Sequence, residues 1–233
     1  KTVKDKTMTT LSITGATFTH AEQTANKLAE ELGLTLVSDE TIMDETARGH
    51  GIKKATLEKV IENKAIAFND FTHEREKCLA CLRKTLAANM LEGNVLFYGL
   101  LGHLIPNWVS HAMRILIVSD KQTRIQQGVE SFGYDEKQAA AMVNQADKRA
   151  IVWTNSLFQK KAWDKSLYDI VIPSDKTTME QSVKLITENI PGVDSDAWET
   201  QARDMELAAD VSIALADAVT GTGLVVFTDS GDV

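Results

Sequence analysis

Residues Thr10–Leu34 read TLSITGATFTHAEQTANKLAEELGL and join a short apolar segment to an amphipathic stretch through a glycine. The pattern predicts a strand, a tight turn at Gly15 and a helix that opens near Thr19–His20 and runs to Gly33. A strand that enters a helix through such a turn directs the first N–H groups of the helix and its positive dipole end at one point. The stretch therefore predicts a loop suited to bind an anion.

This loop differs from the phosphate-binding loop of P-loop proteins, in which the spacing is G-x-x-x-x-G-K-[ST]. Counted from Gly15, the last three positions hold His20, Ala21 and Glu22. The lysine that contacts phosphate and the hydroxyl that contacts Mg²⁺ are both missing. The sequence leaves three alternatives open: a nucleotide site, a former nucleotide site, or no nucleotide site.

The composition is that of a globular protein with a sizeable core, because 43% of the 233 residues are hydrophobic and 25% are charged. The formal net charge of −8 argues against nucleic acid as a partner, since phosphate backbones favour basic surfaces. We expect no transmembrane segment and no secretory leader. Cys78 and Cys81 are expected to lie one turn apart on a helix and to face the protein interior, rather than to form a redox pair or half of a metal site. A reduced, cytoplasmic setting without a metal fits these features.

Short apolar segments alternate with helical patterns along the rest of the chain. This alternation predicts an α/β fold of three layers, in which helices cover both faces of a five-stranded parallel sheet. Ligands of such sheets bind beyond the carboxyl ends of the strands. The other expected strands are Leu34–Val37, Val95–Tyr98, Met113–Val118 and Asp169–Ile172. The expected helices are Asp39–Arg48, Lys54–Glu62, Ala67–Leu91, Lys121–Phe132, Asp135–Asp147 and Thr178–Asn189.

The segment Pro191–Asp196 is rich in Pro, Gly, Ser and Asp, which predicts a linker. We therefore expect a domain over residues 1–190, a linker over 191–197 and a small partial α+β unit over 198–233. The last unit would contain a helix over Trp198–Ala218 and a strand over Leu224–Thr228. Because so few elements bury little surface, this unit is expected to dock, to form a homo-oligomer or to stay partly disordered.

Six motifs between about Leu11 and Ile190 together resemble the cytidylate-kinase-like group of nucleoside monophosphate kinases. They are the strand–loop–helix that ends in LAEELG at Leu28–Gly33, Asp39 after the second strand, Tyr98-Gly99-Leu100 after the third, Arg124 after the fourth, Asp147-Lys148-Arg149 in the lid, and the strand YDIVI at Tyr168–Ile172. The resemblance implies a P-loop kinase fold. It also implies ATP and Mg²⁺ as ligands if the chain is an active enzyme.

The chain departs from that group at both phosphate positions. Family members have a Gly/Ser-rich loop where this chain has the bulky residues Phe18 and His20, which are hard to fit around a triphosphate. The arginine that usually binds the substrate phosphate is replaced by Leu100. Because phosphoryl transfer depends on positioned positive charge, these losses argue against an efficient kinase.

The residues after the linker resemble the start of a BON domain, in which a helix D-x-x-[LI]-x-x-x-[VI]-x-x-A-L precedes V-x-V and x-x-G-x-V segments. The BON family is associated with membranes or envelope components. The matching residues are Glu206-Leu207, Val211, Ala214-Leu215, Val225-Val226 and Gly231–Val233.

The candidates for nucleotide or anion binding are polar or charged residues near the expected strand ends. Arg124 and Arg149 are suited to clamp a phosphate, but equally to lie solvated on their helices. Asp39 is suited to contact a sugar or Mg²⁺, or to cap the next helix. Asp147 is expected to be a helix-end charge, and His20 and His103 to be partly exposed. The complete candidate set is Gly15, Thr17, Thr19, His20, Asp39, Arg124, Asp147 and Arg149.

These observations favour a catalytically impaired, nucleotide-binding regulatory module, a pseudokinase that senses a nucleotide. One alternative is an active nucleoside monophosphate kinase with an atypical loop, in which Arg124 and Arg149 stabilise transition-state charge. The other is a dimerisation or scaffold module that binds no nucleotide.

Overall fold

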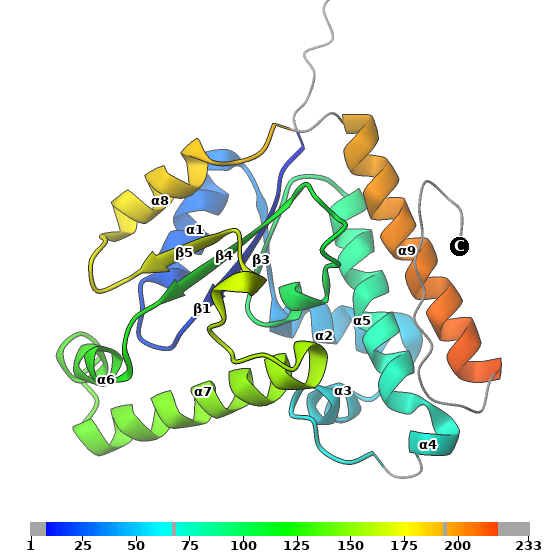
Figure 1. Cartoon of the computed structure of the whole chain (residues 1–233), viewed down its shortest axis with the longest axis horizontal. Coiled ribbons are helices and arrows are strands. Elements are labelled where there is room, and N and C mark those ends of the chain that lie inside the picture. Colours follow the sequence, from blue (N-terminus) through cyan, green and yellow to red (C-terminus); the bar gives the residue numbers. More distant parts are fainter. Residues whose placement is uncertain (1–7, 67–68, 193–194, 219–233) are drawn as a thin grey trace, which may run out of the picture.

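A computed structural model describes residues 8–66, 69–192 and 195–218 (Figure 1). Its centre is a parallel five-stranded sheet with the strand order β2-β3-β1-β4-β5. The expected α/β fold with a parallel sheet is therefore confirmed. The strands are β1 (Thr10–Gly15), β2 (Thr35–Ser38), β3 (Val95–Tyr98), β4 (Ala112–Val118) and β5 (Ile170–Pro173).

Helices connect the strands and cover both faces of the sheet. Figure 1 shows α1 and α8 together on one side, α2, α5 and α9 on the other, and α6 and α7 beyond the ends of β1 and β4. The helices are α1 (Ala21–Leu32), α2 (Asp39–His50), α3 (Lys54–Ile61), α4 (Asn69–Thr72), α5 (Glu74–Leu91), α6 (Lys121–Glu130), α7 (Glu136–Phe158), α8 (Met179–Glu188) and α9 (Ser195–Ala218), with the 3₁₀ turns η1 (Leu101–Leu104) and η2 (Lys165–Leu167).

The two faces of the sheet have separate apolar cores. On β1, Leu11 and Ile13 point to the face covered by α1 and α8 and are fully buried there. On β3, Val95 and Phe97 point to the opposite face, where residues of α2, α3, α5 and α9 pack on them. The central strand β1 was expected to be apolar, but its alternate positions bury the hydroxyls of three residues toward that second face. These residues are Thr10, Ser12 and Thr14.

Helix boundaries follow local capping signals. The hydroxyl of Ser38 accepts a hydrogen bond from the Thr41 N–H and caps α2, so the alternative in which Asp39 is the cap is wrong. Asp135 opens α7 with a capping box, and this helix runs to Phe158, well past the expected end at Asp147. The helix expected over Ala67–Leu91 is divided into α4 and α5 by His73, whose backbone is left-handed with a φ of 48°.

Helix α9 packs along α5 and joins the core of the second face. Trp198 and Met205 are buried in that core, and the Trp198 indole N–H donates to Thr10 Oγ1 of β1 at 3.2 Å. The helix begins inside the segment expected to be a linker. The division at residues 190 and 198 stays a prediction. The strand expected at Leu224–Thr228 and the last BON-like matches lie outside the described residues. Among the described helices, none has the length and hydrophobicity needed to cross a membrane.

Candidate functional site

The loop of residues 16–20 lies at the carboxyl end of the central strand β1, where ligands of this fold class bind. Gly15 permits the tight return of the chain, since a Cβ at this position would lie 2.4 Å from the Ala21 Cβ. The Ala16 N–H donates to the Ile117 carbonyl oxygen of β4 at 3.0 Å. The Thr19 hydroxyl donates back to the Ala16 carbonyl oxygen at 2.7 Å. The loop is therefore a compact turn tied to β4.

His20 joins this loop to the loop before α8. Its Nε2 lies 3.1 Å from the Thr177 carbonyl oxygen, which can only accept, so Nε2–H is the donor. Its Nδ1 lies within hydrogen-bond distance of Thr24 Oγ1, at 3.1 Å, one turn into α1. The expected partial exposure of His20 is confirmed. Both ring nitrogens are occupied, so the imidazole holds two loops together.

In the loop that leads into α1, the backbone N–H groups of Thr17, Phe18 and His20 donate to no other group among the described residues. Such groups at a helix N-terminus favour an anion. The loop therefore retains backbone donors, although it lacks the lysine of a P-loop.

The Phe18 side chain extends from this loop to the hairpin formed by α6 and α7. Its backbone is left-handed, with a φ of 62°. Its ring centroid lies 5.1 Å from that of Phe132 and 5.6 Å from that of Tyr134. The ring also packs on the small core of the hairpin, which contains Ile125, Ala139 and Val143. The bulk of Phe18 is thus accommodated by the hairpin.

Arg124 on α6 is buried and forms a two-pronged ion pair with Asp147 on α7. Both guanidinium–carboxylate distances, Nη1–Oδ1 and Nη2–Oδ2, are 2.8 Å, and Nε donates to the Ser119 carbonyl oxygen at 3.1 Å. Only 3% of the Arg124 side chain and 17% of the Asp147 side chain are exposed. The alternative of a solvated Arg124 and the expectation of a helix-end charge at Asp147 are both wrong. The guanidinium of Arg124 therefore donates to groups of the protein rather than to a ligand.

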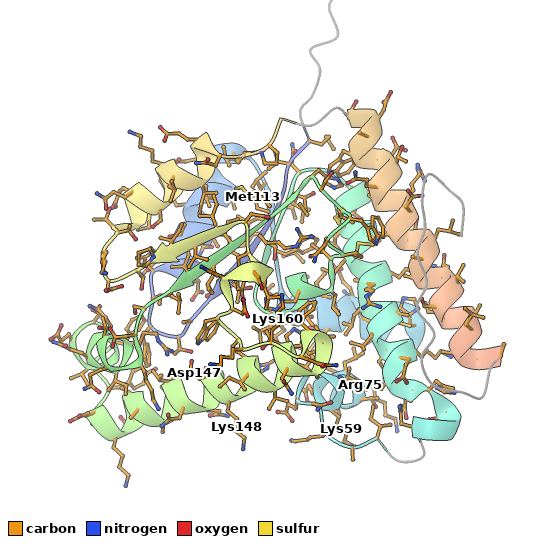
Figure 2. The ribbon with its side chains drawn as sticks, in the orientation of Figure 1. Lys59, Arg75, Met113, Asp147, Lys148 and Lys160 are labelled. Atoms are coloured by element: carbon orange, nitrogen blue, oxygen red, sulfur yellow. The ribbon has the colours of Figure 1, made fainter. Side chains whose placement is uncertain are left out.

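Figure 2 shows Asp147 on the side of α7 that faces α6 and the sheet, and Lys148 on the outer side. Arg149 is exposed and forms no hydrogen bond or ion pair within the described part of the chain. It is close enough to Asp39 and Glu62 to favour the charged forms of both carboxyls. Of the two candidate arginines, Arg149 is therefore the one whose guanidinium is exposed and unpaired in the described part of the chain.

Asp39 fixes the turn that follows β3. Its two carboxylate oxygens accept the N–H groups of Leu100 and Leu101 at 2.8 and 2.9 Å. Gly99 makes room for this contact, because its φ is 137° and a Cβ there would lie 2.3 Å from the carboxylate. Burial raises the pKa of the Asp39 carboxyl, although both N–H groups and Arg149 act in the opposite direction. Both carboxylate oxygens of Asp39 are thus used to hold the backbone turn after β3.

Trp153 of α7 closes the other side of the same turn. Its indole N–H donates to the Leu100 carbonyl oxygen at 3.0 Å, and its side chain is fully buried in the core of the second face. Both backbone polar groups of Leu100, at the position where an arginine would bind substrate phosphate, are therefore occupied by side chains from α2 and α7.

His103 on η1 is buried, so the expected partial exposure is wrong. Tyr168 Oη donates to the Ala162 carbonyl oxygen at 3.0 Å, which leaves His103 Nε2–H to donate to Tyr168 Oη, also at 3.0 Å. Nδ1 has no partner among the described residues. Burial lowers the pKa of His103 to about 4, so the ring is neutral at pH 7. The hydrogen bond between His103 and Tyr168 therefore holds η1 against the segment before β5.

The residues at this site do not fit a Mg²⁺-bound triphosphate. His20, Ala21 and Glu22 occupy the positions of the P-loop glycine, lysine and hydroxyl, and the Thr19 hydroxyl of this loop donates to the Ala16 carbonyl oxygen. Phe18 reaches across to α6 at the point where phosphates would be cradled. What the site offers an anion is backbone N–H groups and one free arginine.

Comparison with known proteins identifies the family. The sequence model of the cytidylate kinase-like family matches residues 10–176. The chain belongs to the cytidylate kinase-like family. The solved structure of an uncharacterized protein from Eubacterium ventriosum is 25% identical, covers 78% of this chain and 98% of its own, and has a TM-score of 0.58. No curated protein matches the chain.

Two shikimate kinase structures also match. That from Bacteroides thetaiotaomicron is 11% identical over 78% of this chain and 97% of its own, with a TM-score of 0.43. That from Aquifex aeolicus is 15% identical over 76% of this chain and 94% of its own, with a TM-score of 0.40.

The sequence placed the candidate residues of this cytidylate kinase-like chain at one edge of the sheet but missed their partners. The contacts of Phe132 and Tyr134 with the loop had no signal except two aromatic residues on either side of Gly133, a pattern that predicts only a turn. The contact of Trp153 with Leu100 depends on the full length of α7, which the sequence did not reveal. The roles of the candidate residues in binding stay predictions.

Proposed function

We propose that this member of the cytidylate kinase-like family is a nucleotide-binding regulatory module that has lost efficient phosphoryl transfer. The observation that carries the proposal is the allocation of positive charge at the site. Arg124 is neutralised by Asp147, Leu100 replaces the substrate-binding arginine, and the loop has no lysine. Since transition-state charge in phosphoryl transfer is stabilised by such cations, the chain lacks the means to accelerate the reaction strongly.

Ligand binding demands less than catalysis. The open N–H groups of Thr17, Phe18 and His20 lie at the start of α1, and exposed Arg149 lies near Asp39 at the same edge of the sheet. Family membership makes a nucleotide the ligand class to test first. The ion pair between Arg124 and Asp147 and the fixed turn after β3 support rigid walls around such a ligand.

The test is thermal unfolding of the full chain with a panel of nucleoside mono-, di- and triphosphates. A nucleotide present at one hundred times its Kd adds about 2.7 kcal/mol of stability. For a chain of this size, each kcal/mol corresponds to about 2–4 °C in Tm, so we expect a rise of about 5–10 °C. If no nucleotide in the panel changes the Tm, the proposal is wrong and the scaffold alternative is favoured.

Arg149 and Lys148 provide a matched pair of variants, because both are exposed neighbours on α7. A charge-assisted hydrogen bond contributes about 1.5–3 kcal/mol, so Arg149→Ala is expected to weaken nucleotide binding about 10- to 100-fold. Lys148→Ala removes the same charge on the outer side of the helix and is expected to change affinity less than threefold, as exposed charges do. Equal effects of the two substitutions in a titration would argue against a specific phosphate contact at Arg149.

A further inference from the structure

The contact between Phe18 and the α6–α7 hairpin has the features of a built socket. The ring centroid of Phe18 lies 5.1 Å from Phe132 and 5.6 Å from Tyr134, in tilted arrangements that aromatic pairs favour. A Cβ at position 128 would lie 2.8 Å from the Phe18 ring, so only glycine there leaves room for it. The ring also packs against a buried cluster that includes Val143. The hairpin is therefore shaped around this one side chain.

The loop is strained where it delivers the ring. Phe18 has a φ of 62°, which a bulky L-residue rarely adopts and which persists only where surrounding contacts compensate for it. The compensating contacts at this position are those of the socket. Loss of the socket would therefore leave the loop free to relax to another conformation.

The socket belongs to a rigid part of the protein that lies beside the loop. Strands β1 and β4 are neighbours in the sheet, and the loop follows β1 whereas α6 follows β4. A ring that reaches from the loop to α6 therefore crosses from one strand end to the next, at the edge of the sheet where ligands of this fold class bind. The ion pair between Arg124 and Asp147 holds α6 to α7, so the hairpin forms a fixed wall.

We propose that Phe18 is a latch that holds the loop of residues 16–20 closed against the α6–α7 hairpin. When the ring leaves its socket, the loop opens and the phosphate of a ligand can approach the backbone N–H groups that have no acceptor among the described residues. The identity of the ligand rests on the proposed function, whereas the latch itself is defined by contacts within the chain. The closed state is the autoinhibited state of the site.

The test uses Phe132→Ala, which removes one wall of the socket without changing the loop sequence. Phe132 is 52% exposed, so the fold is expected to tolerate the change. Ile151→Ala on α7 is the matched control, because Ile151 is 51% exposed and lies away from the socket.

Chymotrypsin cleavage after Phe18, mapped by mass spectrometry, reports opening of the loop. Cleavage after buried Trp153 reports global unfolding. We expect the cut after Phe18 to be several-fold faster in Phe132→Ala only, with the cut after Trp153 unchanged.

ATP binding by the same three proteins, measured by calorimetry, tests whether the latch controls the site. A binding-competent state that is populated at about 10% or less lowers the apparent affinity at least about tenfold. Phe132→Ala is therefore expected to bind ATP about tenfold more tightly than the wild-type chain and Ile151→Ala. Phe18→Gly, which removes both the ring and the strain, is expected to show the same gain.

The outcomes separate the latch from the proposed function. Faster cleavage with no binding of ATP or of any other nucleotide in the panel by any variant supports the latch and contradicts the proposed function. Faster cleavage with equal ATP affinities contradicts control of the site by the latch. Unchanged cleavage after Phe18 in Phe132→Ala, or an equal acceleration in Ile151→Ala, overturns the latch whatever the ATP titrations show.

Discussion

Arg124 illustrates how one residue changes role when its surroundings change. In sequence it is an arginine at the position of a lid arginine, whereas in the fold it is buried and bonded through both terminal nitrogens to Asp147. Removing one partner of such a pair leaves an uncompensated buried charge, which is far more costly than the loss of an exposed pair. The pair therefore serves stability by joining α6 to α7.

Arg124→Ala is expected to lower the free energy of unfolding by about 3 kcal/mol, since it leaves the Asp147 carboxylate without its partner. The control is Arg203→Ala, which breaks an ion pair with Glu199 whose side chains are 64% and 51% exposed. That change is expected to cost about 0.5 kcal/mol or less. Urea denaturation measures both values, and similar small losses in the two variants would show that the Arg124 pair has no structural role.

His103 makes the stability of the fold sensitive to acid. Its pKa is lowered to about 4 by burial, against an ordinary value of 6.5. Below pH 6.5 the unfolded chain therefore binds a proton that the folded chain does not, and stability is lost as the pH falls toward 4. Over this interval the wild-type chain is expected to lose about 3 kcal/mol more than His103→Gln, which retains a donor for Tyr168 but does not titrate.

Urea denaturation at several pH values between 7 and 4 gives this difference directly. The other titrating groups are common to both proteins, so their contributions cancel in the comparison. Parallel pH profiles for the two proteins would contradict a neutral, buried His103.

The positions of these residues were predictable from the sequence, but their partners were not. A glycine after an apolar strand and an aspartate after the next one place Gly15 and Asp39 at one edge of a parallel sheet. Whether a charged side chain at that edge faces solvent, a ligand or its own backbone depends on groups distant in sequence. Asp39 accepts from Leu100 and Leu101, and no local pattern indicates a contact across that separation.

At the scale of elements, the order of strands and helices was predictable because hydrophobic patterns are local. The break at His73 was not, since the residues on both sides favour a helix and a left-handed residue interrupts it. The length of α7 was also missed, because the residues beyond Asp147 gave no clear periodic signal. In the fold, that extra length brings Trp153 onto the turn after β3.

Helix α9 is joined to the rest of the fold both in the core and at the surface. Trp198 is buried in the core shared with α5 and bonds to Thr10, and the pair Lys84–Asp210 at 2.6 Å joins the two helices at the surface. We infer that α9 shares one folding unit with the sheet. Trp198→Ala is expected to lower the free energy of unfolding by about 3–5 kcal/mol, as core tryptophan truncations do. Trp198→Phe is expected to cost about 1 kcal/mol for the lost hydrogen bond and the smaller ring.

Urea denaturation followed by circular dichroism distinguishes this inference from a separate C-terminal unit. A single transition that shifts with Trp198→Ala supports one unit. A main transition unaffected by Trp198→Ala would support the division expected at residue 198.

In the whole molecule, the site combines a kinase-like frame with the loss of the loop lysine and the substrate arginine, the pairing of Arg124 with Asp147, and one exposed arginine, Arg149. The sheet order, the loop after β1 and the turn after β3 remain in place, while Phe18, Leu100 and the Arg124–Asp147 pair occupy the positions that phosphate-handling groups would need. These features support the proposed function, which is nucleotide binding without efficient phosphoryl transfer.

The most direct measurement is the initial rate of phosphoryl transfer by the full chain, with ATP, Mg²⁺ and a series of nucleoside monophosphates at saturating concentrations. Related kinases transfer phosphate at about 1–100 s⁻¹. Without the lysine and the substrate arginine, we expect a rate at least about a thousandfold lower for every acceptor, since each lost transition-state contact costs about 10²–10³ in rate. A rate within the ordinary kinase range that falls steeply in Arg149→Ala would contradict the account and identify an active kinase.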